Sequence, residues 1–297
     1  MRRRPLSTLV ECMPPSSREQ LGQHHAQTRI SGSFRGRWRP GCALQREGKQ
    51  SDAANSLGVK ALVFDVFGTV VDWRGSIVKE GEQWGREKNL QIDWGKFADR
   101  WRAGYGPSMD KVRKGMLPWM KLDALHRMIL DDLLKEFNIT GLTEGEKEHW
   151  NRVWHRLYGW PDAVEGLTRL KKNYIIATLS NGNVSLLVEM AKFAGLPWDT
   201  VFGSDLFHHF KPDHEVYLGA ADLLSLRPSE VMMVAAHPPD LAAAASCGLR
   251  TGLVPRPLEG GPGRTPPPPV TANATAPPAA SFDVVATDFI DLAAKLS

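Results

Sequence analysis

Polar side chains that could do chemistry stand directly after several apolar runs of strand length. In chain order they are Asp65 with Thr69, Ser180 with Asn181, Lys211, and His237 with Asp240. The carboxyl ends of parallel strands lie along one edge of a sheet, where α/β proteins bind their ligands, so we expect these side chains to converge. A carboxylate there can act as a nucleophile that forms a covalent ester. We therefore predict an active site with Asp65 at its centre. The plain alternative is an Asp that only ends a strand and starts a turn.

The other polar residues of this set could support an ionised Asp65. Lys211 would favour the charged carboxylate, because a nearby opposite charge lowers its pKa. Asp240 could hold Lys211 or orient a water molecule. Hydrogen bonds to an anionic substrate could come from the hydroxyl and amide side chains of the set, which are Thr69, Ser180 and Asn181.

Strand and helix patterns alternate through the C-terminal half, which predicts a parallel sheet with right-handed crossovers. The runs predicted as strands are 60–67, 174–179, 200–204, 230–236, 251–254 and 282–286. Between the first two, strand signals disappear and apolar residues recur at helical intervals, as in the stripe Leu122, Leu125, Ile129 and Leu133. The predicted fold class is α/β, with a Rossmann-like parallel sheet and a helical cap inserted after the first strand. We also expect a helix at 184–194 that Gly195 ends.

These patterns divide the chain into segments with different expected structures. The predicted core is 57–75 with 171–297, and the predicted cap is 76–170. Residues 1–56 are Arg-rich and show no period, so we expect a disordered basic extension; a transit peptide has a similar composition. Residues 259–280 are rich in Gly, Pro, Ala and Thr, which predicts a low-complexity loop without means of packing.

Composition narrows the class of protein. Of the 297 residues, 42% are hydrophobic and 24% charged, as in ordinary globular proteins, and no apolar run is long enough to span a membrane. The net charge is +4, but residues 1–50 hold ten basic and three acidic residues, leaving 27 basic against 30 acidic residues elsewhere. We therefore expect neither a nucleic-acid nor a membrane partner. Cys12, Cys42 and Cys247 lack metal-like spacing, which favours free thiols and a cytoplasmic location.

Four stretches carry a resemblance to a known family. Asp65-Val-Phe-Gly-Thr69, Leu179-Ser-Asn-Gly-Asn183, Lys211-Pro-Asp213 and the strand end near Asp240 resemble, in order, the four motifs of the haloacid dehalogenase superfamily. The resemblance covers roughly residues 59–257. Within the superfamily the chain is similar to the type II (L-)2-haloacid dehalogenases, which share Phe-Asp-Val-Phe-Gly-Thr, a cap Arg and Lys-Pro-Asp-x-x-x-Tyr.

The resemblance implies hydrolysis of short 2-haloalkanoic acids to 2-hydroxy acids through an aspartyl ester on Asp65, without a metal or cofactor. It also implies a possible homodimer. The catalytic residues it implies are Asp65, Lys211, Asp240, Thr69 and Asn181. The substrate-binding residues it implies are Arg102 near the halide, Ser180 at the substrate carboxylate, Tyr217, Phe67 and His237.

The main alternative is a phosphatase or phosphonatase-like hydrolase of the same superfamily. Phosphatases of this family use Asp-x-Asp, and the second Asp protonates the leaving alkoxide. Phe67 stands at that position, and the fourth strand end offers a single carboxylate where Mg²⁺ commonly has two. A halide leaving group needs no proton, so these differences favour dehalogenation. A third interpretation is that the protein has this fold but serves as an interaction module whose active site no longer catalyses a reaction.

One motif departs from the family pattern. The better-known type II enzymes carry Ser-Ser-Asn-Ala-Trp-Asp at the fourth strand end, where this chain has Ala235-Ala-His-Pro-Pro-Asp240. His237 therefore replaces an Asn near the catalytic water and the halide. His237 could be a general base, a hydrogen-bond donor to halide, or a structural replacement.

Overall fold

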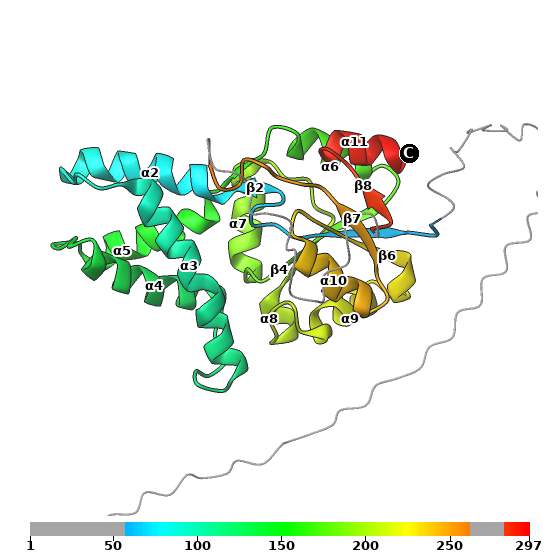
Figure 1. Ribbon diagram of the computed structural model, residues 1–297, viewed down its shortest axis with the longest axis horizontal. Coiled ribbons are helices and arrows are strands. Elements are labelled where there is room, and N and C mark those ends of the chain that lie inside the picture. Colours follow the sequence, from blue (N-terminus) through cyan, green and yellow to red (C-terminus); the bar gives the residue numbers. More distant parts are fainter. Residues whose placement is uncertain (1–56, 262–281) are drawn as a thin grey trace, which may run out of the picture. The chain divides into compact units, whose positions relative to one another are not determined.

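The computed structural model describes residues 57–261 and 282–297, all of which belong to one compact unit, Lys49–Ser297 (Figure 1). The predicted extension at 1–56, with its transit-peptide alternative, lies outside the described residues, and so does most of the predicted low-complexity loop. In the described parts of the chain, no helix is both long and apolar enough to cross a membrane.

A parallel sheet of six strands forms the centre of the fold, in the order β5-β4-β1-β6-β7-β8. Its strands are β1 (Ala61–Phe64), β4 (Ile175–Ser180), β5 (Thr200–Gly203), β6 (Val231–Ala235), β7 (Arg250–Leu253) and β8 (Val284–Val285). Every neighbouring pair is parallel. All four residues of β1 are buried, because this strand lies inside the sheet and both faces are covered. The predicted fold class is confirmed.

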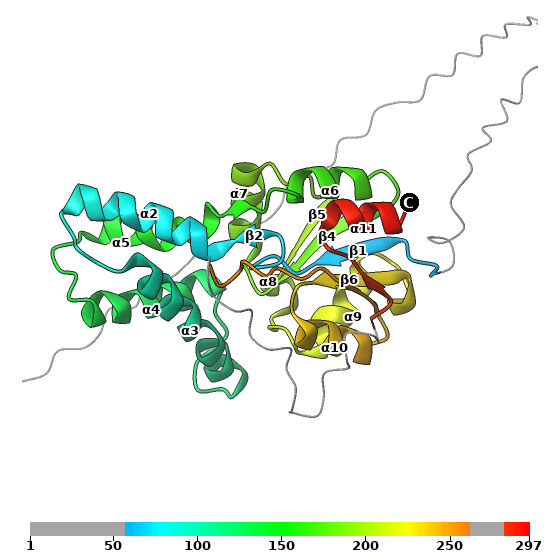
Figure 2. The same cartoon turned by 45° about the horizontal axis from the view of Figure 1, so that its top comes forward.

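Helices cover both faces of the sheet (Figure 2). Alternate residues of β1 enter different hydrophobic cores: Leu62 and Phe64 join one, Ala61 and Val63 the other. The first core is closed by α6 (Ala163–Leu170), α7 (Val184–Ala194) and α11 (Phe289–Lys295). The second is closed by α8 (Ser204–Phe207), α9 (His214–Leu223) and α10 (Pro238–Ser246), with the short helix η2 (Pro228–Glu230) before β6.

Local signals fix several element ends. Gly195 ends α7 in the left-handed conformation with φ of 68°, so the predicted helix at 184–194 is confirmed. The first strand is shorter than its predicted range, 60–67. It ends at Phe64 because the following residues form a turn in which Gly68 has φ of 88°, a conformation that glycine adopts most readily.

The cap consists of α2 (Trp73–Lys88), α3 (Trp94–Arg113), α4 (Leu122–Glu136), α5 (Glu144–Asn151) and the short helix η1 (Arg152–His155). Aromatic rings fill its interior; those of Trp84 and Trp150 stack with centroids 4.3 Å apart. A small antiparallel ladder pairs β2 (Val71–Asp72), before the cap, with β3 (Tyr158–Gly159), after it. The sequence did not predict these two strands, because two residues are too few to show a period.

Helix α6 falls within the predicted cap range, 76–170, but packs against α11 of the core. The contact is close because Gly166 faces Phe289: a Cβ atom at Gly166 would lie 2.3 Å from the Phe289 Cβ and 2.6 Å from its carbonyl carbon. The predicted cap range therefore includes one helix that belongs to the covering of the sheet.

This contact makes Gly166 a test of the packing. We expect Gly166→Val to lower the free energy of unfolding by about 1–3 kcal/mol, because the added atoms meet backbone that cannot move aside. Gly145→Ala in α5 is the matched control, since nothing lies within 4 Å of its added Cβ. Urea unfolding of both variants checks the prediction, and equal stabilities would contradict it.

Candidate active site

Asp65 follows β1 directly and is at the centre of a buried polar network. Its backbone N–H donates to the carbonyl of Val234 at 3.0 Å, which continues the β1–β6 pairing by one residue. The turn at Gly68 then brings Thr69 back, and its hydroxyl donates to Asp65 Oδ2 at 2.7 Å. Only 8% of Asp65 is exposed. The sheet therefore presents this carboxylate in a fixed orientation.

Lys211 links Asp65 to a second carboxylate, that of Asp240, whose side chain is 12% exposed. Its Nζ lies 3.0 Å from Asp65 Oδ1 and 2.5 Å from Asp240 Oδ2. The hydroxyl of Tyr217 donates to the other oxygen of Asp240 at 2.5 Å. Asp65, Asp240 and Lys211, which the sequence predicts at three separate strand ends, are thus in direct contact.

This arrangement keeps the charges of Asp65 and Lys211 in place. Burial alone would raise the pKa of Asp65, but Lys211 and the His237 hydrogen bond hold that pKa well below its usual range. Burial would likewise lower the pKa of Lys211, but Asp240 and Asp65 raise it above its usual value. Burial and Asp240 raise the pKa of Tyr217, so its hydroxyl stays protonated. At neutral pH the site therefore holds an ionised carboxylate beside an ammonium.

His237 lies between two carboxylates. Its Nδ1 is 3.1 Å from Asp65 Oδ2 and its Nε2 is 2.8 Å from Glu259 Oε2. Ionised carboxylates only accept hydrogen bonds, so both ring nitrogens donate, as in an imidazolium. Burial alone would lower the pKa of His237, but the hydrogen bonds to Asp65 and Glu259 raise it from 6.5 to about 10. His237 is therefore charged at neutral pH.

Glu259 is a site residue that the sequence did not reveal. It is the first residue of the stretch predicted to form a loop without means of packing, yet its carboxylate contacts His237 and accepts from Trp73 Nε1 at 3.0 Å. It occupies the space that the missing side chain of Gly68 leaves, since a Cβ there would lie 2.0 Å from Glu259 Oε1. The residue of the sequence that bears on this contact is Gly68, because the missing side chain both allows the turn and leaves room for the Glu259 carboxylate.

Asn181 and Ser180 lie at the end of β4, as predicted, but Asn181 binds the backbone of Lys211. Its Oδ1 accepts from the Lys211 N–H at 2.6 Å, and its Nδ2 donates to the Lys211 carbonyl at 3.4 Å. The hydroxyl oxygen of Ser180 accepts from the Gly182 N–H at 3.2 Å. Asn181 therefore positions the lysine, while the Ser180 O–H can still donate to another group.

The cap places aromatic rings and a cation over Phe67. The Phe67 ring meets those of Tyr105, His126 and Trp154 at centroid distances of 6.4, 6.4 and 5.7 Å. Arg102 Cζ lies 4.3 Å from the Tyr105 ring centroid, and its buried Nη1 has no hydrogen-bond partner among the described residues. Phe67 and Arg102 are thus on the same side of the site.

His126 is a second cap residue that the sequence did not reveal. Its ring stacks on Trp154 with centroids 4.1 Å apart, and neither buried ring nitrogen has a partner in the described residues. Burial lowers the pKa of His126 to about 3, so it is neutral at neutral pH. Within the described ranges, 57–261 and 282–297, no three His, Cys, Asp or Glu side chains are grouped to hold a metal ion.

The order of these residues along the chain agrees with a known family. A model of the haloacid dehalogenase-like hydrolases matches residues 59–248, which include Asp65, Lys211 and Asp240. The chain belongs to this family. The superfamily predicted from the four motifs is confirmed, and with it the prediction of a hydrolase.

Relatives within the family are named 2-haloacid dehalogenases. (S)-2-haloacid dehalogenase 4A of Burkholderia cepacia is 27% identical over 206 residues, which cover 65% of this chain and 81% of that protein. (S)-2-haloacid dehalogenase 1 of Pseudomonas sp. is 28% identical over 211 residues, with coverages of 65% and 83%.

Solved structures of the family resemble this one closely. The defluorinating L-2-haloacid dehalogenase Rha0230 matches with a TM-score of 0.74 and 47% identity, covering 80% of this chain and 95% of that one. The L-2-haloacid dehalogenase PA0810 matches with a TM-score of 0.73 and 44% identity, covering 80% and 100%. The resemblance to L-2-haloacid dehalogenases is therefore confirmed.

The contact between Gly68 and Glu259 can be tested through the pKa of His237. We expect Gly68→Ala to displace the Glu259 carboxylate, so that the pKa of His237 falls from about 10 by at least about one unit. Gly115→Ala is the matched control, because Gly115 also has positive φ but nothing within 4 Å of its added Cβ. NMR titration of histidine-labelled protein gives both values. An unchanged midpoint in the Gly68 variant would show that Glu259 does not support the imidazolium.

Proposed function

We propose that this hydrolase converts short 2-haloalkanoic acids to 2-hydroxy acids through a covalent ester on Asp65. The observation that carries the proposal is the ionised Asp65 carboxylate, which contacts Lys211 and is followed two residues later by the apolar Phe67. The names of the family relatives support the same substrate class.

In the first step, an Asp65 oxygen attacks C2 of the substrate. The new C–O bond forms as the carbon–halogen bond breaks, and its electron pair leaves with the halide. The halide needs no proton from the protein, so an apolar Phe67 suits this step. The charge that departs with the halide is stabilised by a cation, and Arg102, with its unpartnered Nη1, is placed on the Phe67 side of the site.

In the second step, water attacks the carbonyl carbon of the Asp65 ester. One proton of the water passes to a base and the other to the leaving C2 oxygen, so this step releases a 2-hydroxy acid with inverted configuration at C2 and restores the Asp65 carboxylate. Thr69 and Lys211 donate to the two Asp65 oxygens and stabilise the charge that develops on them. His237 already carries a proton, so we assign acceptance of the water proton to Asp240, whose pKa burial raises.

The substrate carboxylate is assigned to Ser180. Its hydroxyl oxygen already accepts from the Gly182 N–H, so its own O–H is available as a donor. In the family resemblance the same residue binds this group. Arg102 and Ser180 would then hold the two charged ends of the reacting molecule.

No observation favours the phosphatase alternative. It requires a general acid two residues after the nucleophile, where the ring of Phe67 is packed among Tyr105, His126 and Trp154. His126 stays neutral there and cannot balance a carboxylate at that position.

Halide release tests the proposed reaction. We expect the protein to release chloride from (S)-2-chloropropionate, and Asp65→Asn to reduce the rate at least about a thousand-fold because the nucleophile is lost. In heavy-oxygen water, the first turnover should place the label in Asp65 and not in the product. Fluoroacetate serves as a second substrate.

The control reaction is a phosphate ester with Mg²⁺. Phosphate release without halide release would contradict the proposal, and so would label that enters the product directly in the first turnover.

The Glu259–His237 contact predicts how activity depends on pH. If the imidazolium supports the attack by Asp65, kcat/KM falls as pH rises through about 10, where His237 loses its proton. Glu259→Gln removes a negative charge beside the ring, so the pKa of His237 and the alkaline limb should move to lower pH. Glu136→Gln, in the exposed ion pair with Arg100, is the control. An alkaline limb that stays in place would rule out this role for Glu259.

A further inference from the structure

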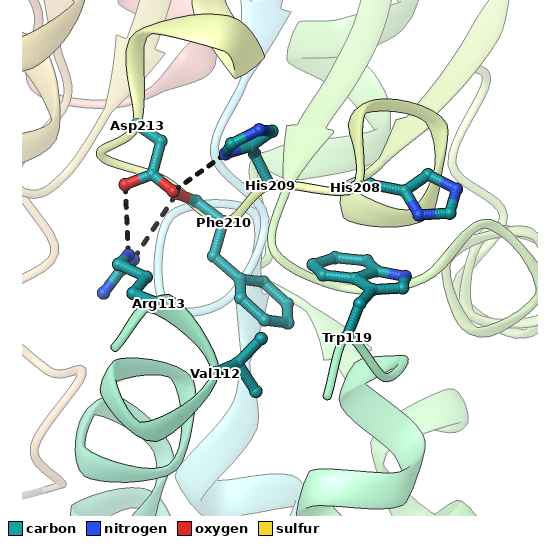
Figure 3. Close-up of a pocket in the computed structure, with 7 residues that line it drawn as sticks. All are labelled: Val112, Arg113, Trp119, His208, His209, Phe210 and Asp213. Atoms are coloured by element: carbon teal, nitrogen blue, oxygen red, sulfur yellow. Dashed lines mark hydrogen bonds and ion pairs between the residues drawn. The ribbon is translucent and has the colours of Figure 1, made fainter. Parts of the chain in front are cut away.

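Arg113, the last residue of α3, reaches from the cap to the core segment that carries Lys211 (Figure 3). Its Nη2 donates to the carbonyl oxygen of Lys211 and, at 3.4 Å, to that of Phe210. Its Nε donates to Asp213 Oδ1 at 3.1 Å. One guanidinium group thus binds three residues within the segment 210–213, and 23% of its side chain is exposed.

The core holds the same segment from another direction. Asn181 Oδ1 accepts from the Lys211 N–H at 2.6 Å, so the backbone of Lys211 has partners in both the core and the cap. The side chain of Lys211 bridges Asp65 and Asp240. Asp213 is also the N-cap residue directly before α9, and α9 carries Tyr217, which donates to Asp240. Two groups of the active site therefore start from the segment that Arg113 binds.

The surrounding contact between cap and core is incomplete. A cavity of about 340 Å³ lies beside Arg113, with Val112 and Trp119 on the cap side and His208 and Phe210 on the core side (Figure 3). The Trp119 ring contacts the Phe210 ring, with centroids 4.7 Å apart. Beside this cavity, the polar contacts of Arg113 join the end of α3 to the core segment 210–213.

We propose that Arg113 is a positioning residue that links closure of the cap to the placement of the Lys211 ammonium between Asp65 and Asp240. The inference rests on the proposed function, because it concerns the activation of Asp65 for attack. With the cap closed, Arg113 and Asn181 hold the Lys211 peptide from two sides. When the end of α3 moves away, Asn181 remains, and the ammonium loses part of its support. Asp65 is then fully activated only when the cap encloses the substrate.

Steady-state kinetics of halide release test this role. We expect Arg113→Ala to lower kcat by about ten- to a hundred-fold, since small displacements of a catalytic group have effects of this size, while KM changes much less. Arg113→Lys should be intermediate, because an ammonium can bind a carbonyl oxygen but cannot hold all three partners. Arg100→Ala, on the same helix and in an exposed ion pair with Glu136, should leave kcat within about twofold.

Added guanidinium ion, at concentrations far below those that unfold proteins, should restore part of the activity of Arg113→Ala and none to the other variants. A purely structural role would not give this rescue. Unchanged kcat in Arg113→Ala, or a loss that guanidinium does not restore, would overturn the proposal. If Arg113→Ala does not fold, the same comparison is made between Arg113→Lys and Arg100→Lys.

Hydrogen exchange of substrate-free protein separates this inference from the proposed function. Amides in 208–217 should exchange faster in Arg113→Ala than in wild type, and equally fast in Arg100→Ala. If wild type releases no halide, the proposed function fails, but this measurement still tests whether Arg113 holds the segment 210–213. Unchanged hydrogen exchange in Arg113→Ala overturns the inference, whether or not the wild type releases halide.

Discussion

The contact of the Lys211 ammonium with the carboxylates of Asp65 and Asp240 is the interaction on which the rest of the site depends. A carboxylate buried without a partner takes up a proton and is no longer a nucleophile. Lys211 prevents this, but it comes from a segment far from Asp65 in the sequence. The parallel sheet brings the two together because β1, β4, β5 and β6 are neighbours and their carboxyl ends share one edge. The fold is thus required to keep Asp65 ionised.

The other charged side chains of the site meet the same requirement, that a carboxylate removed from water has a cation beside it. Three carboxylates, Asp65, Asp240 and Glu259, are accompanied by Lys211, His237 and Arg102. The first two cations contact the carboxylates directly. Arg102 differs, because its buried Nη1 has no partner in the described part of the chain. The three positive and three negative charges of this set balance one another. The cap, rather than the sheet, therefore carries the third cation of this set.

The sequence predicted those parts of the site that depend on local position. Asp65, Thr69, Lys211 and Asp240 follow strands or open helices, and strand ends can be read from apolar runs. Glu259 and Arg113 reach the site only through tertiary contacts, so no local pattern in the sequence predicts their positions. Glu259 was hidden further, because it precedes a stretch of Gly and Pro. Asn181 shows the same limit: its place at the end of β4 was predicted, but its contact with the Lys211 backbone was not.

The segment after Asp65 shows why the chemistry of the site is not set by one residue. Phe67 turns its ring toward the aromatic side chains of the cap, while Gly68 leaves room for the Glu259 carboxylate. A carboxylate at position 67 would be buried against the Trp154 ring and the neutral His126, and Arg102 is the cation on that side of the site. The charge of such a carboxylate would thus depend on side chains of the cap as well as on the motif. Phe67 and the cap rings that cover it are packed as one unit, so a change at position 67 also changes contacts of the cap.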